Sequence, residues 1–290
     1  MNAVEGVVSF RGYETWYRVV GEDAPGRLPL LCLHGGPGST HHYFEPLEQL
    51  AEQGRRVVLY DQLGCGGSSR PEDDSIYSLR LFLDELDTHR AALGLDRVHL
   101  LGTSWGGMLA LEHVLACPDG VAGLVLSSTL CEAEQWTQEV TRLRDELPEA
   151  ERALLGADDR DAPGFAAAEA TFDRRHFHRL DPPHPAVARG LAGKSRRPYE
   201  AMWGRNEWSV TGSLAGWSVC NRLGEIRSPT LVVHGGHDLC TPVIAARLVD
   251  GIADAKYVVL EESSHTPATE EPERYRSAVG GFLERVERAG

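Results

Sequence analysis

The chain has 290 residues, enough for one large α/β domain or two ordinary domains, and 42% of them are hydrophobic. It contains no apolar run near the ~20 residues of a membrane-spanning helix. Its N-terminus lacks the basic-then-apolar layout of a secretory signal. The formal net charge of −14 disfavours nucleic acids and anionic membranes as partners. We therefore expect a cytoplasmic globular protein that binds neither nucleic acid nor membrane.

Cysteines and histidines give little sign of a disulfide framework or a metal site. The six cysteines are Cys32, Cys65, Cys117, Cys131, Cys220 and Cys240, with no C-x-x-C pair. This spacing favours reduced, mostly buried thiols, although a catalytic cysteine is an alternative. The histidine pairs at 41–42, 176–178 and 234–237 lack a Cys or carboxylate set at the usual ligand spacing. We expect neither a metal nor a cofactor.

Strand-like and helix-like runs alternate at both ends of the chain. The first set comprises strands at 5–10, 15–20 and 28–35, a helix at 43–54, a strand at 55–62, a helix at 78–94, a strand at 97–104, a helix at 105–118 and a strand at 121–130. The second set comprises a strand at 229–236, a helix at 243–253, a strand at 256–263 and a helix at 271–288. Buried strands that alternate with helices predict a parallel sheet covered on both faces.

The stretch between the two sets is polar and helix-rich. The simplest interpretation is one sheet domain, formed by residues 1–130 and 215–290, with a helical cap inserted over 131–214. Sheets of this kind bind ligands beyond the carboxyl ends of their strands, so we expect the cap to cover the site.

One turn in the first set carries a serine between glycines. In "HLLGTSWGGMLAL", Gly102, Ser104 and Gly106 fit the pattern G-x-S-x-G between a strand and a helix. A tight strand-to-helix turn lifts the serine hydroxyl to the sheet edge, and the glycines let neighbouring backbone pass close. The alternative is a serine that only caps the helix.

A serine nucleophile needs a base and an acid that orients the base. In this topology the acid and the base follow the serine in that order, each just beyond a later strand. Asp238 follows the strand "PTLVVHGG", and His265 follows the strand "KYVVLEES". His234 and His237 are rivals for the base, but His237 adjoins the acid in sequence. Asp61 precedes the serine, so we interpret it as a carboxylate that organises a loop.

The glycine-rich loop at 34–38, "HGGPG", follows a buried strand. Glycine lets a backbone N–H approach a substrate oxygen, so we expect the N–H groups of Gly36 and Trp105 to form the oxyanion hole. Gly35, next in the loop, is expected to face the substrate. An ordinary glycine-rich turn is the alternative. Together these residues predict a cofactor-free serine hydrolase that acts through an acyl-enzyme.

These motifs make the sequence similar to the proline iminopeptidase family, including the amino-acid amidases and the tricorn-interacting aminopeptidases. The resemblance spans nearly the whole chain and rests on "HGGPG", "YDQLGCGGSSRP", "GTSWGG", "SSH", "GRNEWSVTGSLAGW" and "RLGEIRSPTLVV". It implies an α/β-hydrolase fold with a mostly parallel eight-stranded sheet, helices on both faces and a helical cap. It also implies hydrolysis of the amide bond after an unblocked N-terminal residue, often proline, or of small amino-acid amides.

The resemblance also suggests substrate-binding residues. Glu207 matches a carboxylate that relatives place near the substrate amine, and an exposed cap carboxylate is the alternative. His176 matches a cap histidine of relatives. Trp203, like Trp105, either walls the pocket or belongs to the core. Leu239 stands where relatives carry a second carboxylate, so recognition of the amine has one charge fewer.

Two other functions remain open at this point. One is an esterase or amide hydrolase of a specialised pathway that does not require a free amine. The other is a non-catalytic binder of a small ligand.

Overall fold

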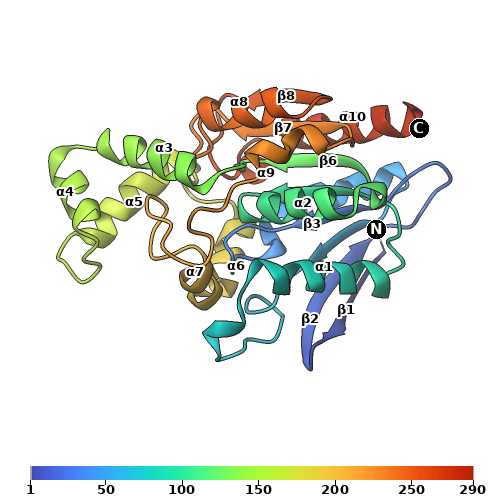
Figure 1. Cartoon of the computed structure of the whole chain (residues 1–290), viewed down its shortest axis with the longest axis horizontal. Coiled ribbons are helices and arrows are strands. Elements are labelled where there is room, and N and C mark those ends of the chain that lie inside the picture. The colour runs from blue at the N-terminus through green and yellow to red at the C-terminus, as the bar shows by residue number, and fades with distance from the viewer. Residues whose placement is uncertain (1, 290) are drawn as a thin grey trace.

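The computed structural model describes residues 2–289, in which eight strands form one sheet in the order β1-β2-β4-β3-β5-β6-β7-β8 (Figure 1). The strands are β1 (Ala3–Phe10), β2 (Tyr13–Val20), β3 (Leu30–Leu33), β4 (Val57–Tyr60), β5 (Val98–Thr103), β6 (Val121–Ser127), β7 (Thr230–Gly235) and β8 (Ala255–Leu260). β2 is antiparallel to β1 and to β4, and every other neighbouring pair is parallel. The mostly parallel, eight-stranded sheet is therefore confirmed.

Helices cover both faces of the sheet, and the central strands β3 to β7 are buried along their whole length. Alternate side chains of one strand point to opposite faces, so Leu31 and Leu33 join one core cluster while Leu30 and Cys32 join the other. The first cluster includes α1 (Leu79–Ala92), α2 (Trp105–Ala116) and α8 (Pro242–Gly251). The second includes the 3₁₀ helix η1 (His41–Gln53), α9 (Pro267–Glu270) and α10 (Pro272–Ala289).

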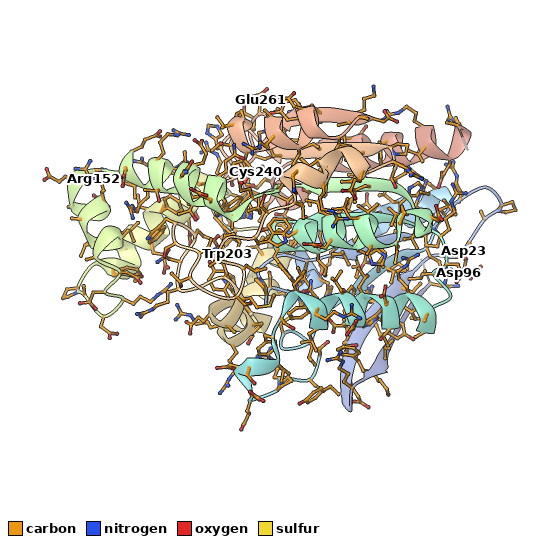
Figure 2. The ribbon with its side chains drawn as sticks, viewed as in Figure 1. Asp23, Asp96, Arg152, Trp203, Cys240 and Glu261 are labelled. Atoms are coloured by element: carbon orange, nitrogen blue, oxygen red, sulfur yellow. The ribbon has the colours of Figure 1, made fainter. Side chains whose placement is uncertain are left out.

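Five helices lie between β6 and β7 in the chain and extend beyond one end of the sheet (Figure 1). They are α3 (Ala133–Asp145), α4 (Glu149–Ala157), α5 (Phe165–His176), α6 (Pro185–Gly193) and α7 (Arg196–Met202). Shorter 3₁₀ turns are η2 (Asp74–Ile76), η3 (Pro118–Gly120) and η4 (Cys220–Glu225). In Figure 2, Arg152 lies at the far end of this insertion and Trp203 lies inside the molecule near the sheet. No helix among the described residues has the length and apolar character needed to cross a membrane.

The segment predicted as a helix over 43–54 differs in type from an α-helix. It is a 3₁₀ helix over His41–Gln53, and Pro46 inside it has no N–H to donate to an α-helical ladder. Gly54 ends it with φ 76°, the left-handed conformation that glycine adopts without a steric cost.

Candidate active site

Ser104 occupies the turn between β5 and α2 in a strained conformation. Its φ of 53° and ψ of −123° are unusual for a residue with a side chain. A Cβ atom on Gly102 would lie 2.2 Å from the carbonyl oxygen of Gly106, and one on Gly106 would lie 2.0 Å from that of Leu33. Both glycines are therefore required for the turn, as the G-x-S-x-G pattern predicts.

Asp238 and His265 meet at the carboxyl ends of β7 and β8. The Nδ1 atom of His265 lies 2.7 Å from Oδ1 of Asp238, and both side chains are buried. The backbone N–H of Cys240 donates to Oδ1 at 2.9 Å, and that of Gly235 donates to Oδ2 at 3.3 Å. These donors fix the carboxylate, which in turn orients the imidazole.

The pKa shifts of this pair agree with an ion-pairing arrangement. Burial raises the pKa of Asp238, but the charge and hydrogen bond of His265 outweigh burial and hold it below its usual value. Burial lowers the pKa of His265, but the charge and hydrogen bond of Asp238 raise it above its ordinary value. The carboxylate is therefore ionised at neutral pH and stabilises a protonated imidazole.

Ser104 and His265 line one cavity of about 70 Å³ under the insertion. Among the described residues, no hydrogen bond joins the Ser104 hydroxyl to the imidazole. Catalytic hydrogen bonds are often long in the absence of substrate, so the shared cavity is the relevant observation. Glu207, from the segment after α7, lines the same cavity.

The loop at 34–38 forms another wall of this cavity. Gly36 has φ 111°, and a Cβ atom there would lie 2.6 Å from the N atom of Gly38. The Gly35 N–H donates to the Tyr43 hydroxyl, whereas no hydrogen bond in the described part of the chain uses the N–H of Gly36. As the first residue of α2, Trp105 also has an N–H without a partner inside the helix.

Gln62 links the loop at 34–38 to the indole of Trp105, a role that the sequence alone did not suggest. Its backbone N–H donates to Nε2 of His34 at 3.0 Å, and its side-chain amide donates to the His34 carbonyl at 2.9 Å. Its Oε1 accepts from the indole N–H of Trp105 at 2.8 Å. Next to it, Asp61 accepts from the backbone N–H of His41 at 2.9 Å and holds the loop, as expected.

Comparison with known proteins shows the family and the fold of the chain. A family model described as the alpha/beta hydrolase fold matches residues 29–272. Proline iminopeptidases of Lactobacillus delbrueckii subsp. bulgaricus and Clostridioides difficile (strain 630) are each 40% identical over 98% of this chain, and the match covers 98% and 99% of those proteins. The chain belongs to the proline iminopeptidase family of α/β hydrolases. The crystal structure of a proline iminopeptidase of Mycobacterium smegmatis has a TM-score of 0.89, 37% identity and 99% coverage of both chains. The crystal structure of VinJ has a TM-score of 0.92 and 39% identity, and the match covers 98% of this chain and 99% of VinJ.

In this family member, Glu207 faces two connected spaces. Its Oε1 accepts from the Tyr199 hydroxyl at 2.8 Å, and its backbone carbonyl accepts from the indole of Trp136 at 3.1 Å. Besides the inner cavity, it lines an outer cavity of about 810 Å³ enclosed by residues of the insertion. Lys194 and Tyr199 also line both cavities, so the two spaces adjoin.

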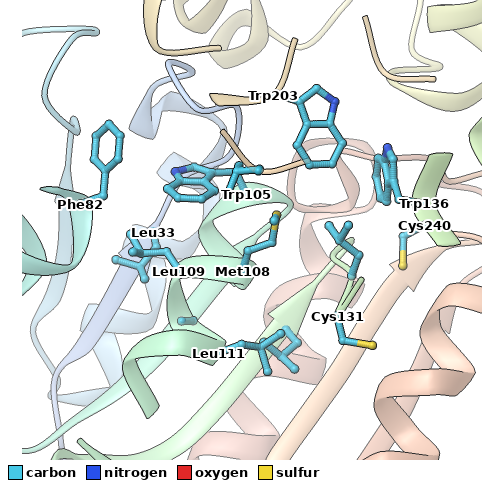
Figure 3. Packing of buried hydrophobic residues seen from close by; sticks show 14 of the residues in the cluster. Leu33, Phe82, Trp105, Met108, Leu109, Leu111, Cys131, Trp136, Trp203 and Cys240 are labelled. Carbon is cyan, nitrogen blue, oxygen red and sulfur yellow. The ribbon is translucent and has the colours of Figure 1, made fainter. Parts of the chain in front are cut away.

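Leu239 and the indoles of Trp203 and Trp105 do not line the inner cavity. Leu239 is fully buried and belongs to the hydrophobic core. Trp203 packs against Trp136, with ring centroids 6.0 Å apart, and Trp105 belongs to the same core cluster (Figure 3). The expectation that these two indoles wall the pocket is therefore wrong, and the alternative of core packing holds.

His176 also lies outside the lining of both cavities, but it contacts the loops of the candidate acid and base. Its Nδ1 atom lies 3.0 Å from the His237 carbonyl oxygen. Its own carbonyl accepts from the backbone N–H of His265 at 3.2 Å. The last turn of α5 is thus fastened to both loops, a long-range contact that no local pattern indicates.

The expectation that no carboxylate accompanies the histidine pairs is wrong for His41 and His42. Within residues 2–289, donor atoms of His41, His42 and Glu45 lie within 4.8 Å of one another because η1 turns Glu45 toward the histidines. However, Nδ1 of His41 is hydrogen-bonded to Asp61 at 2.8 Å, and Glu45 forms an ion pair with Arg189. A second group comprises Asp87, His113 and Cys117.

Proposed function

We propose that the protein is a serine hydrolase that cleaves the amide bond after an unblocked N-terminal residue, as a proline iminopeptidase-like aminopeptidase or an L-amino-acid amidase. One observation carries the proposal. Ser104 and the Asp238-bound His265 line the same cavity as the carboxylate of Glu207. The names of its relatives, proline iminopeptidases, support this substrate class.

In the proposed mechanism, His265 accepts the proton of Ser104 as the hydroxyl oxygen attacks the scissile carbonyl carbon. Asp238 stabilises the imidazolium, which then donates its proton to the leaving amine. Water, activated by the same imidazole, hydrolyses the acyl-enzyme. The N–H groups of Gly36 and Trp105 would bind the oxygen on which negative charge develops in both steps.

The free amine of the substrate would bind to Glu207. A charged ammonium that leaves water needs a negative partner, and this carboxylate already holds one hydrogen bond from Tyr199. The side chain of Leu239 is aliphatic and buried, so it offers no acceptor to the amine. Relatives carry a second carboxylate at the position of Leu239. Here Glu207 would therefore bind the amine without that second acid.

The substitution Ser104→Ala tests the mechanism. We expect it to lower turnover of alanyl and prolyl arylamides by at least about 10⁴-fold, because the covalent step is lost. Thermal unfolding should be almost unchanged, since the hydroxyl makes no hydrogen bond to any residue within 2–289. Retained turnover would exclude the acyl-enzyme. Failure of a fluorophosphonate to label Ser104 would favour the non-catalytic binder instead.

The absence of a second carboxylate at position 239 favours one alternative, an esterase or amide hydrolase without a free-amine requirement. We distinguish the two by comparing prolyl and alanyl arylamides with their N-acylated forms. The aminopeptidase should prefer the free amines by about 10²-fold or more, because acylation removes the charge that Glu207 binds. Equal rates on both forms would establish the alternative.

A further inference from the structure

The two ends of the helical insertion lie side by side. Glu132, just before α3, forms an isolated antiparallel bridge with Ser218, just before η4. The Val219 N–H donates to the Cys131 carbonyl at 2.9 Å. The chain therefore enters and leaves the insertion through a short two-stranded ribbon.

One cysteine lies on each strand of this ribbon. The Sγ atoms of Cys131 and Cys220 are 2.7 Å apart, although the residues are 89 positions apart in sequence. A disulfide needs an S–S length of about 2.05 Å and side chains that point toward each other, so only a small adjustment separates the thiols from a bond. Both cysteines are free thiols here.

The surroundings of the two thiols differ. Cys131 is buried, and burial raises its pKa, whereas Cys220 is partly exposed. The guanidinium of Arg247, in α8, is near Cys220, and its Nη2 lies 3.7 Å from Oε2 of Glu132. Because Cys220 is the more accessible of the two thiols, it is suited to attack first and the buried Cys131 to resolve.

We propose that Cys131 and Cys220 form a redox modification site, at which a low-molecular-weight disulfide such as oxidised glutathione converts the two thiols into a reversible disulfide. The Cys220 thiolate attacks one glutathione sulfur and releases one glutathione thiolate. Cys131 loses its proton to solvent and attacks the Cys220 sulfur, which releases the second glutathione. The protein loses two electrons and glutathione disulfide gains them.

The disulfide would clamp the base of the insertion against the active site. α3 begins two residues after Cys131, and its Trp136 packs with its ring centroid 5.8 Å from that of His265. The bond would also close a long loop in the unfolded chain. Because closing a loop of this length lowers the entropy of the unfolded chain, we expect Tm to rise by roughly 5–10 °C on oxidation. Dithiothreitol should reverse the rise.

The experiment uses the full chain equilibrated with defined ratios of oxidised and reduced glutathione. Digestion without reduction, followed by mass spectrometry, should give a Cys131 peptide joined to a Cys220 peptide with the loss of two hydrogens. Cys117 is exposed, so its conversion to a glutathione adduct shows that the oxidant has reacted. A glutathione adduct on Cys117 with both Cys131 and Cys220 unlinked would overturn the proposal.

Matched variants locate the change in Tm. Cys220→Ser should abolish both the linked peptide and the rise in Tm, whereas Cys117→Ser should keep both. A linked pair that leaves Tm unchanged would overturn the clamp. Peptide mapping of the chain without substitutions needs neither variant. The presence or absence of the linked peptide therefore decides the proposal even if a variant fails to fold.

Discussion

At the scale of single residues, the site depends on charges that act on one imidazole. The ionised Asp238 raises the pKa of His265, and Glu207 and Glu270 raise it further, against the opposing effect of burial. The base works only when it is neutral. We therefore expect kcat/KM to fall as pH decreases through a pKa that lies above the ordinary value for histidine.

The fall of kcat/KM at low pH is the acid limb of the pH profile. Replacing Glu207 by Gln should move this limb to lower pH, because a negative charge that stabilises the imidazolium is removed. The limb is measured from kcat/KM with an N-acylated substrate, which does not need Glu207 to bind an amine. Glu134→Gln, an exposed change in α3, is the control and should leave the limb in place. An acid limb that moves to higher pH in Glu207→Gln would contradict the electrostatic assignment.

The residues that the sequence predicted best are those whose positions follow from local turns. Ser104, Asp238 and His265 each stand just past a strand, and parallel strands bring their carboxyl ends to one edge. In contrast, the sequence did not predict how a side chain is oriented relative to distant parts of the chain. Leu239 and Trp203 face the core, and Gln62 spans two loops, because of contacts with residues far away in sequence.

At the scale of elements, the start of α2 depends on close backbone approach. We expect Gly106→Ala to destabilise the protein by about 3 kcal/mol or more and to abolish activity, since its Cβ would meet the Leu33 carbonyl at 2.0 Å. Gly281→Ala is the matched control, because it also lies in a helix and its Cβ would meet nothing within 4 Å. Urea denaturation should show no loss of stability for the control. Equal stability of the two variants would show that the turn tolerates a side chain.

The elements themselves were largely predictable, because buried strands and amphipathic helices have distinct periods. The structure confirms the strand at 97–104 and the helix at 105–118 to within two residues at each end, as β5 and α2. The type of the helix near Pro46 was not predictable, since apolar spacing alone does not separate a 3₁₀ from an α-helix over a short segment.

At the scale of the whole molecule, one carboxylate anchors the C-terminal helix to the sheet. Glu287 of α10 accepts from Arg55 at 2.7 Å, from Arg27 at 2.8 Å and from the Leu28 N–H at 2.9 Å, and lies 3.2 Å from Nε2 of His99. The Arg55 side chain is fully buried. Burial raises the pKa of Glu287, but these donors together outweigh it and hold that pKa far below its usual value.

Glu287→Gln should lower the free energy of unfolding by about 3 kcal/mol at pH 7, because Arg55 would remain buried without its charge partner. A depressed carboxyl pKa contributes stability above the pKa of the unfolded chain, and this stability is lost as pH falls toward the folded pKa. Urea denaturation at pH 7 and at pH 4 should therefore show a smaller acid-induced loss in the variant. Glu284→Gln, on the same helix with a half-exposed side chain, should change stability little. Similar losses for both variants would show that the buried network is not the cause.

The contacts of α5 have one further consequence for the molecule as a whole. The carbonyl of His176 holds the backbone of His265, and its ring holds that of His237, next to the acid. Any displacement of the last turn of α5 would therefore also displace the backbone of His265 and of His237, so the position of the base depends on the insertion staying in place.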